Sequence, residues 1–180
     1  SMPLFIVGTA VTSLGAWSVV PIEPQAHIII YVGSTIVLVG ALLLVIAGFD
    51  NLIRSNLAAQ GIRKATVAQK VRALLRDPLK FGALWQMVFM NFVVSFPGLF
   101  MAAKLEDIFR VWSLRQERSI LTGHWHVLSG IIATIILFLY ADMAGLKGRV
   151  RQIFGWVIIV ASDLAFAAAS AYSSRRLFVT

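Results

Sequence analysis

The chain has 180 residues, of which 59% are apolar and only 13% are charged, and its mean hydropathy is +0.84. A soluble domain of this size cannot bury so many apolar side chains, because much of its surface must face water, so a soluble enzyme is excluded. We interpret the net charge of +8 as basic residues in membrane loops and not as a sign of nucleic-acid binding. The chain has no Cys, which excludes disulfides and thiolate metal sites.

Five stretches are long and apolar enough, or nearly so, to cross a bilayer as helices, which takes about 20 residues each. We expect these spans at roughly 3–20, 26–49, 81–103, 120–141 and 153–172. The first is followed by Pro21 and Pro24 instead of a cleavage motif, so we interpret it as a retained helix and not as a signal peptide. The sequence therefore predicts an all-α, polytopic transmembrane helix bundle with about five spans, forming one domain over residues 1–180.

Two connections are expected to form helices on the membrane surface, at about 62–76 and 104–118, because apolar residues recur there at helical spacing among charged ones. Ten Lys and Arg lie in the connections at 50–80 and 142–152, against six on the other side of the membrane. The positive-inside rule then puts the N-terminus inside and the C-terminus outside. We expect an integral protein of a prokaryotic cell membrane. Its expected partners are membrane lipid and other membrane subunits or further copies of this chain, with no nucleic acid.

The three histidines of the chain are His27, His124 and His126. His27 begins the second expected span and the other two begin the fourth, so all three are expected near the outer face at a similar depth. At 100° per residue His124 and His126 project about 200° apart, so they reach two different sites on opposite faces of one helix. A neutral imidazole is a good axial ligand of haem iron, and an apolar helix bundle can hold a porphyrin. The alternative is that the imidazoles merely lie among the lipid head groups.

Three motifs together resemble a known family. The segment GHWHVLSG at 123–130 is similar to the tenth transmembrane helix of subunit I in the haem-copper oxidase superfamily. That family also has Ala-His near the outer start of its second helix, running on to G-F-x-N, and this chain has AH at 26–27 and GFDN at 48–51. An arginine pair follows the eleventh helix of the family, and RR stands here at 175–176, after the fifth expected span.

The resemblance implies a role for each matching residue. His27 and His126 would be the two axial ligands of a low-spin haem b, and His124 would ligate a second haem. Arg175 and Arg176 would hold the haem propionates, which guanidinium groups bind in a two-pronged manner. The family binds copper through three further histidines that this chain lacks, so no copper site is expected. The chain alone is therefore incomplete for oxygen reduction, and whether it is an enzyme stays open.

The function implied by the resemblance is a haem-binding membrane protein that transfers electrons. It would act alone or as a subunit of a haem-copper-oxidase-like oxidoreductase of a respiratory chain, with one or two haem b groups as its iron-containing cofactors. The alternative is a non-catalytic structural or assembly subunit whose helices pack against a larger partner. Small residues that allow close helix approach favour this alternative, such as Gly33, Gly40 and Gly48 and the alanines of the fifth span.

Asp163 lies near the middle of the fifth expected span, where a charged side chain is costly and is usually functional or paired. It either belongs to a proton path, or it is neutral or bonded to a polar side chain of a neighbouring helix. The candidate partners for this bond are Ser34, Thr35 and Asn91. Pro97 is expected to kink the third span.

Overall fold

The computed structural model describes residues 2–17, 24–104, 108 and 111–178, and it describes His27, Arg175 and Arg176 by their backbone alone. Over these residues every regular element is a helix, which confirms the prediction of an all-α fold. The elements are α1 (Met2–Trp17), α2 (Pro24–Ala58), α3 (Val67–Leu75), α4 (Pro78–Phe89), the π-helix η1 (Met90–Ser95), α5 (Phe96–Ala103), α7 (Leu114–Met143) and α8 (Gly148–Phe178).

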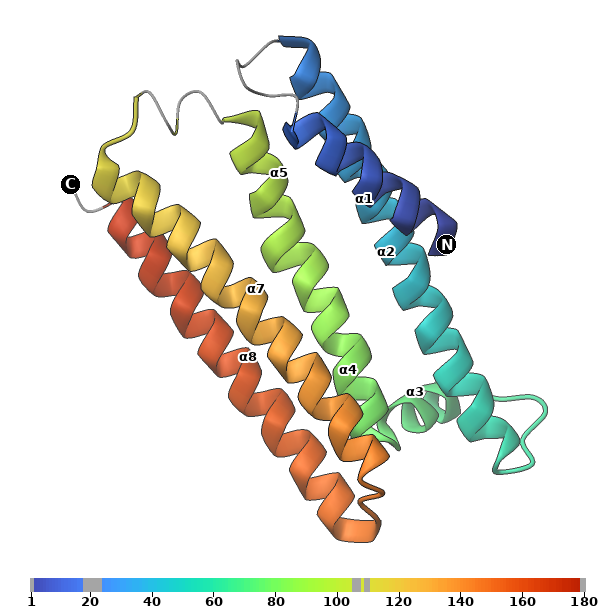
Figure 1. The fold of residues 1–180 in the computed structure, drawn as a ribbon. Helices are drawn as coiled ribbons and strands as arrows, with labels where there is room; N and C mark the ends of the chain where they lie inside the picture. The colour runs from blue at the N-terminus through green and yellow to red at the C-terminus, as the bar shows by residue number, and fades with distance from the viewer. Residues whose placement is uncertain (1, 18–23, 105–107, 109–110, 179–180) are drawn as a thin grey trace.

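The long helices stand side by side in a bundle (Figure 1). At one side α7 and α8 pack as an antiparallel hairpin, and α4 contacts both of them. At the other side α1 packs along α2. The short helix α3 lies at the end of the bundle where α2 ends and α4 begins, which we call the α3 end; α7 begins and α8 ends at the opposite end, the far end (Figure 1).

Three helical stretches among the described residues are long and apolar enough to cross a membrane: Ile28–Ala58, Leu114–Met143 and Gly148–Tyr172. They are compatible with an integral membrane protein, but they do not account for all five expected spans. Helix α1 has 16 residues, fewer than the about 20 that a bilayer core requires. The third expected span is divided into α4, η1 and α5.

The interruption of the third expected span lies directly before Pro97, in the six residues of η1. Proline has no N–H to continue an α-helical ladder, and single π-helical turns commonly accommodate such a break. The Asn91 amide donates to the Met87 carbonyl at 2.9 Å, and the Ser95 hydroxyl donates to the Met90 carbonyl at 3.5 Å. The polar residues of this segment therefore satisfy the backbone of their own helix.

A capping box sets the beginning of α3. The Thr66 hydroxyl accepts from the Gln69 backbone N–H, and the Gln69 side chain accepts from the Thr66 backbone N–H at 2.8 Å. These two bonds satisfy donors that the first turn of a helix leaves free. Helix α3 is consequently shorter than the surface helix expected at 62–76.

A second capping box, between Ser113 and Gln116, sets the beginning of α7. Helix α7 thus runs over Leu114–Met143, longer than the span expected at 120–141. The surface helix expected at 104–118 is corrected accordingly, because its last five residues form the first turns of α7. Residues 105–107 and 109–110 lie outside the described part of the chain.

Ion pairs join three helices at the α3 end. The Arg151 guanidinium donates to both carboxylate oxygens of Asp77, at 2.7 and 2.8 Å, and also to the Asp142 carboxylate. Asp77 in addition accepts from the backbone N–H of Lys80 and so caps α4. This cluster, Asp77, Asp142 and Arg151, fixes the turn between α7 and α8 against the start of α4.

Gly82 allows α4 to approach α7 and α8 closely. A Cβ atom at this position would lie 2.5 Å from Phe138 Cζ and 3.0 Å from Ile159 Cγ1. The Phe138 side chain is only 1% exposed and packs in a core cluster with Leu79 and Ile159. We expect Gly82→Ala to lower the free energy of unfolding by about 1–3 kcal/mol, as overpacking of a core does.

Denaturation of the purified protein in detergent, followed by circular dichroism, measures this effect. Gly98→Ala is the control, because a Cβ there would contact its nearest neighbour at an ordinary 3.4 Å. Equal stability of the two variants would show that Gly82 is not a site of tight packing.

Candidate functional site

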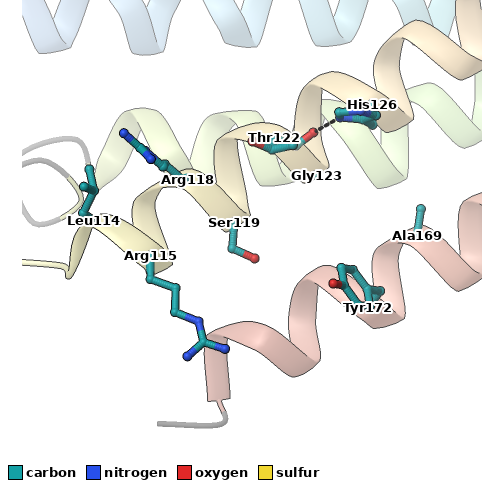
Figure 2. A pocket seen from close by; sticks show the side chains of 9 residues that line it. All are labelled: Leu114, Arg115, Arg118, Ser119, Thr122, Gly123, His126, Ala169 and Tyr172. Atoms are coloured by element: carbon teal, nitrogen blue, oxygen red, sulfur yellow. Dashed lines mark hydrogen bonds between the residues drawn. The ribbon is translucent and has the colours of Figure 1, made fainter.

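His126 lines a cavity of about 730 Å³ between α7 and α8, near the far end of the bundle (Figure 2). Its volume falls within the range of small-molecule and cofactor sites. Helix α7 supplies most of the wall, and α8 supplies two residues. We call this the His126 cavity; it is lined by Leu114, Arg115, Arg118, Ser119, Thr122, Gly123, His126, Ala169 and Tyr172.

Most of the polar lining of the His126 cavity comes from one face of α7, and Tyr172 of α8 adds a further polar group. Arg115, Arg118, Thr122 and His126 are separated by three, four and four residues, which places them in one stripe along the helix. Two guanidinium groups therefore stand near the start of α7, and an imidazole stands deeper along the same stripe (Figure 2).

A hydrogen bond fixes the tautomer of His126. Its Nδ1 atom lies 2.8 Å from the carbonyl oxygen of Thr122 (Figure 2). A carbonyl oxygen only accepts, so Nδ1 carries the hydrogen, and Nε2 of the neutral ring keeps a free lone pair. Imidazoles that ligate metals typically have their other nitrogen held by such a carbonyl. The Nε2 atom of His126 is thus available as a metal ligand.

His124 lines a second, smaller cavity of about 420 Å³, which we call the His124 cavity. Its wall comes from α1, α2, η1, α5 and α7, and its lining is Thr9, Ile30, Ser34, Val37, Leu38, Val94, Ser95, Gly98, Leu99 and His124. The two histidines of α7 therefore reach two different sites, as their separation of about 200° around the helix predicts.

The structure places His27 in the first turn of α2 at the far end, and its side chain lies outside the described part. Position 27 shares a helical face with Ile30, Ser34 and Leu38, all of which line the His124 cavity. Among the described residues, none from α2 lines the His126 cavity. Residues of α2 therefore border the His124 cavity, and the pairing of His27 with His126 that the resemblance implies stays a prediction.

Two arginines of the site were missed by the sequence analysis. Arg115 and Arg118 were assigned to a separate surface helix, whereas both line the His126 cavity. Their helical spacing to His126 gives the signal once α7 is known to be continuous. Arg175 and Arg176 lie in the last turns of α8, also at the far end, and their side chains are outside the described part.

Asp163 bonds to two side chains of α4. Its Oδ2 accepts from Trp85 Nε1 at 2.8 Å, and its Oδ1 accepts from Gln86 Nε2 at 3.0 Å. Thr35 and Asn91 donate instead to backbone carbonyls of their own helices. The sequence analysis named Ser34, Thr35 and Asn91 as candidate partners of Asp163, and this prediction was wrong. The carboxylate bonds to Trp85 and Gln86 instead.

Within the described part of the chain, no group of three or more His, Asp or Glu side chains is arranged to hold a metal ion. No protein-family model matches the chain, and no curated protein or solved structure matches it either. The resemblance to the haem-copper oxidases consequently stays a prediction that rests on the motifs of the sequence.

Proposed function

We propose that the chain is a haem-binding integral membrane protein that transfers electrons, either by itself or as a subunit of a haem-copper-oxidase-like respiratory complex. One observation carries this proposal: the Nε2 atom of His126 keeps a free lone pair in a cavity that two arginines also line. Haem requires an imidazole nitrogen for its iron, cations for its propionates and an apolar surrounding for its ring.

The lining of the His126 cavity supports the proposal of haem b. His126 would hold the iron through Nε2, and Arg115 and Arg118 would pair with the propionates. Arg175 and Arg176, proposed for the propionates from the resemblance, would add to the positive charge at the same end. The bound haem would supply one-electron redox chemistry, and the chain would bind and orient it.

We further propose that His27 pairs with His124, because the face of α2 that contains position 27 borders the His124 cavity. A haem held by this pair would have both axial positions filled, and a haem on His126 would keep one position open. Carbon monoxide added to the reduced protein should then perturb only part of the haem spectrum.

The histidine variants distinguish the two pairings. We expect His126→Ala to remove the part of the spectrum that responds to carbon monoxide. His27→Ala and His124→Ala should both remove the part that does not respond. If His27→Ala and His126→Ala instead remove the same part, the pairing implied by the family resemblance is the correct one.

For the topology, we propose that all five expected stretches cross the membrane of a prokaryotic cell, with the N-terminus inside. Because the chain has no Cys, single-cysteine variants report sidedness directly. Lys64→Cys and Lys147→Cys, both exposed positions at the α3 end, should react with an impermeant maleimide only after the cells are opened. Val111→Cys, 76% exposed at the far end, should react in intact cells. The reverse pattern would invert the topology.

The competing proposal is a structural subunit that holds no haem. It is favoured by the alanines that α8 leaves exposed, at positions 165, 167, 168 and 171, where a partner helix could approach closely. The glycines of α2 favour it less, since Gly48 packs on Leu84 of the same chain and Gly33 and Gly40 are buried. Under this proposal, replacing all three histidines leaves the cofactor content of the assembled complex unchanged.

A further inference from the structure

A polar cluster lies between α4 and α8, far from both ends of the bundle. Its central residue is Asp163. One turn toward the α3 end, Ile159 packs in a core cluster with Phe138 of α7; one turn toward the far end, Phe166 packs in a second core cluster with Ile131. Asp163 therefore lies between two apolar layers, at the middle of a helix long enough to cross a membrane.

Gln86 is the buried partner in this cluster. It is 0% exposed, and its Nε2 donates to Asp163 Oδ1 at 3.0 Å and to Ser162 Oγ at 2.9 Å. The Ser162 hydroxyl in turn donates to the Ile159 carbonyl. The Oε1 atom of Gln86 has no hydrogen-bond partner among the described residues. A buried acceptor left in this state destabilises the fold, because it has lost its hydrogen bonds to water.

The orientation of the Gln86 amide depends on whether Asp163 carries a proton. An ionised carboxylate only accepts hydrogen bonds, so it requires the Nε2 donor that faces it here. The oxygen and nitrogen ends of an amide have nearly the same shape, and rotation by 180° would put Oε1 at the same place. There it would accept from the O–H of a protonated Asp163. Either orientation leaves one end of the amide without a partner. The orientation seen here suits an ionised carboxylate, and the rotated one suits a proton on the carboxylate oxygen that faces Gln86.

No cation neutralises Asp163 in the part of the chain that the structure describes; its partners are an amide and an indole. The titratable groups of α4 and α7, which pack against α8, lie outside the layer of Asp163, because on α7 none of them falls between Ile131 and Phe138. On α4 these groups are Lys80 and the N-cap residue Asp77. On α7 they are Arg115, Glu117, Arg118, His124, His126, Tyr140 and Asp142. Because an ion is costly inside a bilayer and such carboxyls often relay protons, a proton is the natural partner of Asp163.

We propose that Asp163, Gln86 and Ser162 form a proton-binding site in the middle of the membrane. One O–H bond of a hydronium ion breaks, a water molecule is released, and the proton forms an O–H bond with one carboxylate oxygen of Asp163; when the proton leaves, this bond breaks and a water molecule accepts the proton. No electron moves in this step. The Gln86 amide rotates with each change, and Trp85 holds the second carboxylate oxygen throughout. The site uses none of the proposed haem ligands, so it does not depend on the proposed function.

Dicyclohexylcarbodiimide tests this proposal, since this apolar reagent reacts with protonated carboxyl groups in apolar surroundings. We expect mass spectrometry of the treated full-length protein in membranes to find the adduct on Asp163, with less labelling as the pH rises. Asp163→Asn should lose the adduct, and the control Asp142→Asn should keep it. Labelling that Na⁺ blocks at constant pH would assign the site to a metal cation and overturn the proposal.

Infrared spectroscopy keeps the proposal testable if the reagent does not reach the site. We expect a carboxylic-acid C=O band that shifts in D₂O and is lost in Asp163→Asn. Gln86→Met, which removes both ends of the amide at nearly constant size, should shift this band without abolishing it. Absence of the band at every pH would overturn the proton site, and an unshifted band in Gln86→Met would overturn the role of Gln86.

Discussion

Replacing His126 with alanine is expected to remove the proposed haem from the His126 cavity, which is the largest single effect that follows from the proposed function. The arginines and the apolar wall remain in this variant, but none of them donates a nitrogen lone pair to iron. Loss of an outer partner of a metal ligand already weakens metal binding by about 10–100-fold, so loss of the ligand itself should cost more. A pyridine haemochrome assay on the purified protein measures the haem bound per chain.

Trp125→Phe is the matched control for this experiment. Its side chain is 64% exposed, precedes His126 directly and does not line either histidine cavity. This variant should keep the haem content of the unmodified protein. If His126→Ala keeps it too, the imidazole is not a ligand, and the hydrogen bond to the Thr122 carbonyl only fixes the ring against its own helix.

Replacing Arg151 with methionine is expected to cause the largest loss of stability, about 3 kcal/mol. The variant leaves the carboxylates of Asp77 and Asp142 facing the same space without their common cation. Removing one partner of a fully buried ion pair costs about 3–5 kcal/mol. The Arg151 and Asp77 side chains are 18% and 17% exposed, so water screens the cluster in part, and the lower end of that range applies.

Denaturation in detergent, with Arg149→Met as the control, measures this loss. Arg149 is exposed two residues earlier on α8 and makes no ion pair in the described part of the chain. Combining Arg151→Met with Asp77→Asn should recover part of the lost stability, because it removes one of two neighbouring negative charges, of which Lys80 at 3.9 Å from Asp77 offsets only a part. Equal stability of Arg151→Met and Arg149→Met would mean that the cluster contributes nothing to folding.

The fold class could be predicted from the sequence, but the beginning and end of each helix could not. Long apolar runs identify helices because a bilayer requires length and low polarity. Helix ends depend on individual hydrogen bonds instead. The capping box of Ser113 and Gln116 starts α7 within a charged stretch that hydropathy alone assigns to the membrane surface.

The candidate site was predictable where its geometry is local. The separation of His124 and His126 around one helix follows from their spacing, and it holds in the structure. Contacts between distant segments left no such signal. The indole of Trp85 reaches Asp163 across 78 residues of sequence, and Arg151 reaches Asp77 across 74. Only the packing of α4 against α8 brings these groups together.

Bound haem is the central claim, and one spectrum tests it most directly. The protein purified in mild detergent from haem-replete cells should give a reduced-minus-oxidised difference spectrum with the bands of haem b, at one or two haems per chain. A colourless protein from the same cells, folded by circular dichroism, would contradict the claim.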